Sequence, residues 1–382
     1  MNARLSCLKV LNRVLDRGGY SSQSLDAELS VLEKDGTADR RDIAFITRNT
    51  LGVIQNLYLL DFYIDSFTVK PEKLDKIVRN ILRLGVYQIV FSDSVPARAA
   101  VNESVELCKA SKVLSASSLV NAVLRKISDA YNANALPEPS GLSVKYSHPE
   151  WFVQRMISLH GGIFAESFLK ADNEIAEISY HEGFSGEKYV QDMAAYRAVE
   201  MAKPLPGESV LDCCAAPGGK SFTAACLMNN KGKIVSCDIH EKKLKLVREG
   251  ALRLGISIIE TVQADASKEK PEFIDSFDLV IADVPCSGFG VIRKKPEIRY
   301  KSEYEIAGLP EIQEKIINNV SKYVKAGGRL LYSTCTVFPE ENEDIVNDFL
   351  LKHTDFSLVE MKAFYPNTDG TDGFFAAVMK KK

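Results

Sequence analysis

The sequence has no long apolar run. A membrane-spanning helix needs about 18 or more consecutive apolar residues, and no stretch of the 382 residues reaches that length. The first residues, MNARLSCLKVL, predict a charged amphipathic helix and not a secretory signal peptide. We therefore expect a cytoplasmic protein with no membrane anchor.

Metal-ligand spacings are also absent from the sequence. None of the eight cysteines forms a C-x-x-C pair, and no two of the five histidines lie at ligand spacing. We therefore expect no metal site. The cysteines are expected to be reduced thiols, most of them small core residues.

The chain has little excess charge of either sign, with a net charge of −3. Residues 1–150 hold 19 basic and 17 acidic side chains (+2), and residues 151–382 hold 29 and 34 (−5), which sums to −3. Neither part is strongly basic, so any binding of nucleic acid would depend on local patches. Composition alone weighs slightly against an RNA partner.

Residues 1–132 have the pattern of a helical domain. Apolar residues recur at the spacing of an amphipathic helix within 5–15, 43–57, 77–85 and 113–127. No side chain here demands chemistry, so the pattern alone favours an all-α partner-binding module.

Residues 133–200 predict a linker followed by a short intermediate subdomain. The linker, 133–150, is rich in Pro, Ser and Asn. Two helices are expected, around 151–159 and 191–201, and the stretch 175–190 between them is ambiguous.

Residues 201–382 alternate between short apolar runs and helical stretches. This alternation predicts a doubly wound, mainly parallel α/β sheet. The expected strands are 209–211, 233–238, 256–262, 277–283 and 329–334, with a closing hairpin from 356–361 and 373–380.

The stretch 208–220, ESVLDCCAAPGGK, reads as a strand, a glycine turn and the start of a helix. Such a turn presents backbone N–H groups to a ligand at the carboxyl edge of the sheet. A Walker phosphate loop would need glycine where Cys214 stands, and no G-x-G-x-x-G dinucleotide fingerprint is present here. S-adenosylmethionine remains as a candidate ligand, beside the plain alternative of an ordinary tight turn.

Acidic residues follow four successive expected strands, namely Asp212, Asp238, Asp265 and Asp283. A single aspartate at such a place is usually a turn former, but four at one edge favour a ligand site. Asp238 is suited to accept from a ribose diol, and Asp265 lies where an adenine amino group could be read.

Two cysteines stand at the same edge: Cys286 follows Asp283 in the run DVPC, and Cys335 follows the fifth strand. Each could be an inert packed thiol. Methylation of carbon 5 of a cytosine would use both, because a thiolate must first add at carbon 6. Asp283 would supply a proton to N3, and the second thiol would assist release. An N-methyltransferase would instead tend to carry an aromatic residue in place of Cys286.

These motifs resemble those of the bacterial Sun/Fmu-type RNA cytosine-C5 methyltransferases. The resemblance rests on 214–220 (CAAPGGK), 283–288 (DVPCSG) with Arg293 and Pro296, 332–336 (YSTCT) with 340–343 (EENE), and 372–375 (DGFF). The N-terminal third matches through 82–88 (LRLGVYQ), 95–96 (VP), 101–103 (VNE) and 119–125 (LVNAVLR). The resemblance covers nearly the whole chain.

The resemblance implies a class I, Rossmann-like methyltransferase domain at 201–382, after a NusB-like RNA-binding domain at 1–132. It implies S-adenosylmethionine as cofactor and small-subunit ribosomal RNA as partner, with a monomer expected. Cys335 would be the nucleophile and Cys286 the residue that assists release, with Asp283 beside them. The implied cofactor residues are Cys214, Ala215, Ala216, Pro217, Gly218, Gly219, Lys220, Asp238, Asp265 and Asp283.

The chain departs from the family's pattern in its middle. Between 148–151 (HPEW) and 191–192 (QD) the family usually carries a considerably longer segment with a small RNA-binding subdomain, whereas this sequence has only a short stretch from Asn173 to Gly186. An alternative function is therefore a cofactor-loaded RNA-binding protein with little or no activity. An ATP-binding P-loop protein is a further rival, which Cys214 disfavours.

Overall fold

The computed structural model describes residues 3–36 and 38–382, so residues 1, 2 and 37 of the predicted first domain lie outside it. The chain packs as two compact units. Unit 1 comprises Met1–Asn173 together with Arg293–Tyr300, and unit 2 comprises Glu174–Ile292 with Lys301–Lys382. This division differs from the three predicted parts, 1–132, 133–200 and 201–382, which remain a prediction.

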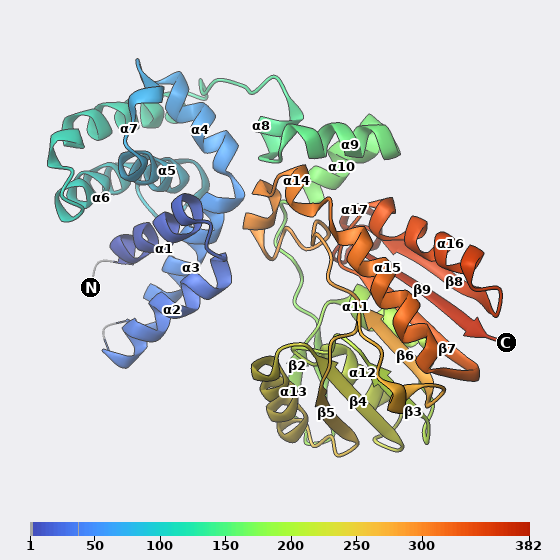
Figure 1. The fold of residues 1–382 in the computed structure, drawn as a ribbon. Helices are drawn as coiled ribbons and strands as arrows, with labels where there is room; N and C mark the ends of the chain where they lie inside the picture. The colour runs from blue at the N-terminus through green and yellow to red at the C-terminus, as the bar shows by residue number, and fades with distance from the viewer. Residues whose placement is uncertain (1–2, 37) are drawn as a thin grey trace. The chain divides into compact units, whose positions relative to one another are not determined.

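Unit 1 is helical (Figure 1, blue to green for residues 3–173), and its large apolar core is formed by residues between Cys7 and Ile127. The helical spacing seen in the sequence therefore places apolar side chains on the inner faces of its helices. The α-helices are α1 (Ala3–Arg17), α2 (Ser21–Lys34), α3 (Arg40–Gln55), α4 (Leu57–Ser66), α5 (Lys76–Phe91), α6 (Ala97–Ala110), α7 (Ser117–Asn132), α8 (Leu142–Tyr146), α9 (Glu150–His160) and α10 (Gly162–Ala171). Short 3-10 turns are η1 (Pro71–Lys73), η2 (Leu114–Ala116) and η4 (Pro296–Tyr300).

Two features of unit 1 differ from the sequence-based expectation. The predicted linker contains α8, and a third helix, α10, lies between the two helices expected in 151–200. Helix α10 buries Ala165, Phe168 and Leu169. This helix is short and has few polar residues, so its helical periodicity in the sequence is weak.

Unit 2 is built on a seven-stranded sheet in the order β5-β4-β3-β6-β7-β9-β8. The first five strands in this order are parallel, whereas β9 runs antiparallel to both β7 and β8. The strands are β3 (Ser209–Asp212), β4 (Lys233–Asp238), β5 (Ile259–Gln263), β6 (Phe277–Asp283), β7 (Val324–Thr334), β8 (Phe356–Phe364) and β9 (Phe374–Lys381). The ambiguous stretch 175–190 forms a separate hairpin of β1 (Tyr180–Glu182) and β2 (Lys188–Val190).

Helices cover both faces of the sheet (Figure 1), as expected for a doubly wound fold. One face packs against α11 (Met193–Ala202), α12 (Gly219–Leu227) and α13 (Glu241–Arg253), and the other against α15 (Leu309–Val320) and α16 (Glu343–Lys352). Shorter elements are α14 (Glu303–Ile306), α17 (Pro366–Asp369), η3 (Pro271–Phe273), η5 (Ser321–Tyr323) and η6 (Pro339–Glu341). In the described part of the chain no helix is both long and apolar enough to cross a membrane.

Two strand boundaries differ from the prediction. Strand β5 begins at Ile259 and not at residue 256, and it ends at Gln263, so Asp265 lies in the following loop. Strand β7 begins at Val324 and not at residue 329, and its pairing with β6 is irregular between Phe277 and Leu279. This local irregularity in the pairing lets the strand continue through Gly327 and Gly328.

Candidate functional site

The candidate cofactor loop joins β3 to α12, as its sequence predicts. Gly218 adopts φ +118°, and a Cβ there would come within 2.4 Å of the Phe222 ring. Only glycine therefore suits this position. Helix α12 begins at Gly219, so the loop delivers backbone N–H groups and the positive end of the helix dipole to the edge of the sheet.

Backbone hydrogen bonds fix the loop beside the neighbouring strand. The N–H of Ala215 donates to the carbonyl of Cys237 at 2.7 Å, and the N–H of Gly218 donates to Ala215 at 2.7 Å. The Ala216–Pro217 peptide bond is cis. Cys214 is half-buried in the same loop. The loop residues thus lie together at the carboxyl end of β3 and β4.

Asp212, at the end of β3, is fully buried beneath this loop. Its Oδ2 accepts a hydrogen bond from the Ser221 hydroxyl at 2.7 Å. Burial, opposed by that hydrogen bond, raises the pKa of Asp212 to about 7. Asp212 therefore supports the loop from below, and a ligand would not reach it.

The raised pKa of Asp212 predicts a stability change with pH. Relative to its value of 3.8 in the unfolded chain, the folded protein binds extra proton between about pH 4 and pH 7, so stability falls as the pH rises through this window. Asp212→Asn removes this loss, and the variant should gain roughly 2–4 kcal/mol on wild type between pH 4 and pH 8. Denaturant unfolding at several pH values measures the difference; a pH-independent difference would contradict the prediction.

Asp238 and Asp265 lie at the same edge of the sheet, but their carboxylates differ in their hydrogen-bond partners. Oδ1 of Asp238 accepts from the N–H of His240 at 2.8 Å, and its other oxygen accepts no hydrogen bond among the described residues. Asp265 bonds within its own turn: Oδ1 accepts from Ser267, and Oδ2 pairs with Lys268 at 3.3 Å. The Ser267 hydrogen bond lowers the pKa of Asp265. Asp265 would have to exchange partners to read an adenine.

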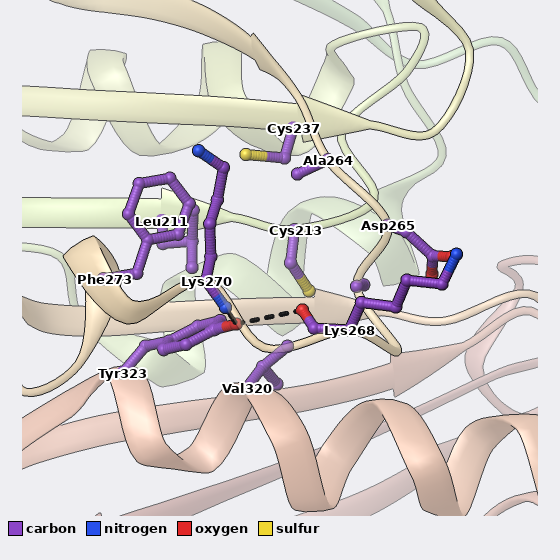
Figure 2. Close-up of a pocket in the computed structure, with 11 residues that line it drawn as sticks. Leu211, Cys213, Cys237, Ala264, Asp265, Lys268, Lys270, Phe273, Val320 and Tyr323 are labelled. Carbon is purple, nitrogen blue, oxygen red and sulfur yellow. Dashed lines mark hydrogen bonds and ion pairs between the residues drawn. The ribbon is translucent and has the colours of Figure 1, made fainter.

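A small cavity lies under the Asp265 loop, lined by Cys213, Cys237 and Tyr323 among others (Figure 2). Its free volume of ≈ 10 Å³ is about that of one water molecule, so it cannot hold a nucleoside. The Tyr323 hydroxyl donates to the carbonyl of Lys268 at 3.2 Å (Figure 2), and Asn319 donates to the same carbonyl at 2.9 Å. These two side chains hold the loop in place, and the sequence did not single them out.

The two candidate catalytic cysteines meet at the ends of β6 and β7. The Sγ atoms of Cys286 and Cys335 are 3.2 Å apart, and the backbone N–H of Cys335 donates to Cys286 Sγ at 3.3 Å. Both side chains are only partly buried. The parallel pairing of the strands, with Asp283 opposite Ser333, brings together residues that are 49 positions apart in the sequence.

Asp283 is held on both sides next to this pair. Its Oδ2 forms an ion pair with Lys220 Nζ at 2.7 Å, and its Oδ1 accepts from the Ser333 hydroxyl at 2.8 Å. The Lys220 ammonium also lies 5.0 Å from the centre of the Phe374 ring, a cation–π contact. Cofactor loop and cysteine pair are therefore joined through Lys220 and Asp283.

The surroundings of Cys286 and Lys220 shift the pKa values of both side chains. The hydrogen bond with Cys335, together with burial, raises the pKa of Cys286 well above its ordinary value. Burial pushes the pKa of Lys220 down, but the Asp283 carboxylate outweighs burial and raises it, with a smaller contribution from Cys335. This arrangement keeps a proton on Cys286 and a positive charge on Lys220.

Buried polar residues brace the two cysteine loops. Glu341 accepts from the Ser287 N–H at 2.9 Å and from Gln313 Nε2 at 2.8 Å. Gln313 also donates to the carbonyl of Pro285 at 2.9 Å. Asn342 accepts from the Thr334 hydroxyl and donates to the carbonyl of Thr336 at 3.1 Å, thereby bridging the residues that flank Cys335. Glu341 and Asn342 lie in the run 340–343 on which the resemblance drew, whereas Gln313 was not singled out in the sequence.

The donor set at this edge fits an adenosyl cofactor. The glycine loop leaves room for backbone N–H groups to approach a ligand, and the free oxygen of Asp238 suits a hydroxyl. No three His, Cys, Asp or Glu side chains gather as a metal site within the residues that the structure describes.

Comparison with known proteins identifies the family. Residues 199–380 match the model of the 16S rRNA methyltransferase RsmB/F family, and residues 1–129 match the NusB family. A probable ribosomal RNA small subunit methyltransferase B of Bacillus subtilis is 34% identical, with 98% of each chain covered. The chain belongs to the RsmB/F family. This membership confirms the resemblance, the fold class and the prediction of an S-adenosylmethionine-dependent ribosomal RNA methyltransferase.

One further relative carries the same name, and one solved structure has a similar fold. The ribosomal RNA small subunit methyltransferase B of Photorhabdus laumondii is 30% identical, with 100% of this chain and 99% of that protein covered. The crystal structure of PH0851 matches with a TM-score of 0.78 and 25% identity, and covers 100% of this chain and 98% of that one. The Bacillus alignment spans 440 residues against 382 here, so that RsmB/F relative has residues without a counterpart in this chain.

Proposed function

We propose that this protein methylates carbon 5 of a cytosine in small-subunit ribosomal RNA through a covalent bond between Cys335 and carbon 6. The observation that carries the proposal is the 3.2 Å approach of Cys286 to Cys335 beside the Lys220–Asp283 ion pair. S-adenosylmethionine supplies an electrophilic methyl group when it is bound. The target base would be turned out of its helix, because addition at carbon 6 needs access to the ring face.

The proposed reaction assigns each group one task. The Cys335 thiolate adds to carbon 6, and the electron pair of the 5,6 double bond becomes available at carbon 5 as N3 gains a proton. Asp283 passes this proton to N3 from the Lys220 ammonium, which lies 2.7 Å from its Oδ2. Carbon 5 then takes the methyl group.

Release reverses the addition. A base must remove the proton from carbon 5, which restores the double bond, expels the Cys335 thiolate and returns the proton on N3. Cys286 is the neighbouring group for this task. Its pKa is raised beside Cys335, so it first gives its own proton to water and then takes the proton from carbon 5.

The experiment that tests this function uses Cys286→Ala. With unmodified small-subunit ribosomal RNA and S-adenosylmethionine, the variant should complete methylation but retain the base on Cys335. A denaturing gel should then show a shifted protein–RNA band. The Cys286→Ala/Cys335→Ala double variant is the control and should give no band.

A second outcome of the same experiment would contradict the proposal. If Cys286→Ala binds both the cofactor and the RNA yet forms no band, the cysteine-addition mechanism fails. That result would favour the alternative of an RNA-binding protein with little or no activity, for which the shorter middle of this chain is the structural reason.

A further inference from the structure

Residues 293–300 belong to unit 1 although the chain on both sides of them belongs to unit 2. We call these residues the inserted segment. The chain leaves unit 2 after Ile292, forms the turn η4 as part of unit 1 and re-enters unit 2 at Lys301. Cys286 lies a few residues before the departure point.

Arg299 fixes the inserted segment in unit 1. Its side chain is fully buried, and its Nη1 lies within hydrogen-bond distance of four oxygens. These are the carbonyls of Gln55 (2.7 Å), Ser147 (3.1 Å) and Tyr146 (3.5 Å) and Oδ1 of Asn173 (3.0 Å). The acceptors come from the ends of α3 and α8 and from the last residue before unit 2, where helix dipoles favour a cation.

Two more side chains of the inserted segment bind unit 1. Glu297 accepts from the N–H and the hydroxyl of Ser21 at 3.1 and 2.6 Å, at the start of α2. The Tyr300 hydroxyl donates to the carbonyl of Ile54, and its ring packs edge-on against Tyr58 with centroids 5.3 Å apart. The segment is therefore fixed at three points.

The bonds of Arg299 are not optimised for stability. Burial lowers its pKa, and its Nε and Nη2 have no hydrogen-bond partner among the described residues. A buried charge with unsatisfied donors is costly, and apolar replacements of such groups are often neutral for folding. We therefore attribute the presence of Arg299 to its role in holding the inserted segment in place, and not to a gain in folding stability.

Lys301, where the chain re-enters unit 2, contacts the loop that carries Cys286. Lys301, next to Tyr300, donates through Nζ to the carbonyl of Ser287 at 3.0 Å. Ser287 directly follows Cys286, and its N–H is held by Glu341. A displacement of the inserted segment would therefore move Lys301 and loosen the backbone beside Cys286.

We propose that Arg299 and Tyr300 are positioning residues for Cys286: by fixing the inserted segment in unit 1, they hold the loop that performs release. This inference rests on the proposed function. It assigns to unit 1 a part in the release step in addition to any contact with RNA.

The test uses Arg299→Met, which keeps the volume of the side chain and removes its donors. We expect kcat to fall about tenfold to a hundredfold, with the KM for S-adenosylmethionine unchanged. Because release becomes slow, the covalent protein–RNA band should accumulate although Cys286 is present. A loss of stability alone would lower activity without producing that band.

Matched variants complete the test. Arg83→Met removes an arginine of unit 1 that pairs with Asp61 at 2.6 Å and whose hydrogen bonds go to Asp61 and Asn80, and it should give wild-type kcat and no band. Tyr300→Phe removes one hydroxyl only and should give a weaker band and a smaller loss of kcat. Wild-type kcat and no band in folded Arg299→Met, or in folded Tyr300→Phe if Arg299→Met does not fold, would overturn the inference.

Hydrogen exchange separates this inference from the proposed function. In the full chain without RNA, Arg299→Met should exchange the amides of residues 285–292 and 301 faster than wild type and Arg83→Met do. Faster exchange without a band in Cys286→Ala would mean that the proposed reaction is wrong while the anchoring holds. Unchanged exchange in Arg299→Met, together with a band in Cys286→Ala, would mean that the proposed reaction holds while the anchoring by Arg299 is wrong.

Discussion

Cys335→Ala is expected to lose methyl transfer to RNA by a factor of about a thousand or more, as removal of a covalent nucleophile does in other enzymes. Carbon 5 of cytosine is too weakly nucleophilic without addition at carbon 6, and Cys286, with its raised pKa, is a poor replacement. Transfer of a labelled methyl group measures the loss.

Cys226→Ala is the matched control for this variant. Cys226 is a half-buried thiol of the same unit whose Sγ donates to the carbonyl of Glu182, on the short hairpin. It should keep wild-type activity. Cofactor titration should give similar affinities for wild type and both variants. If Cys335→Ala still methylated RNA, Cys335 would not be the nucleophile.

Gly290→Ala should be the most damaging small substitution near the site. A Cβ at Gly290 would lie 1.9 Å from the carbonyl oxygen of Gly373 and 2.9 Å from that of Cys335. Both oxygens belong to backbone, so neither can move as a flexible side chain could. We expect a loss of about 3 kcal/mol or more in unfolding free energy, or a displaced Cys335 loop with activity reduced about a hundredfold.

The geometry around Gly290 explains this sensitivity. Its N–H donates to the carbonyl of Cys335 at 2.9 Å, and its carbonyl accepts from Gly373 at 2.8 Å. Gly308→Ala is the control, because no atom lies within 4 Å of a Cβ built there and its φ is −88°. Denaturant unfolding and methyl transfer measure both variants. Wild-type stability and activity in Gly290→Ala would contradict this packing.

The strands and the loop were predictable because their signals are local. Short apolar runs, glycine turns and acids at strand ends recur within a few residues, and the sheet follows from their alternation. The meeting of Cys286 with Cys335 depends on which strands are neighbours and on their register. The sequence placed both thiols at one edge but could not give their separation.

Two details near the site depend on contacts that the sequence does not show. Asp265 stays a prediction as the residue that reads an adenine amino group; in the structure its carboxylate bonds to Ser267 two residues on, a local turn that competes with any ligand. Arg299 was not singled out in the sequence. Its burial depends on helix-end carbonyls contributed by residues far earlier in the chain, which no local pattern reveals.

The inserted segment also bears on how the chain folds during synthesis. Most of unit 1 ends at Asn173, but its last residues are 293–300. At about 5–20 residues per second, translation needs roughly 6–25 s to pass from residue 173 to residue 300. During that interval the carbonyls of Gln55 and Ser147 lack the guanidinium that they bind in the finished protein. The helical half emerges from the ribosome first, yet it is completed only after the glycine loop of the second half has been made.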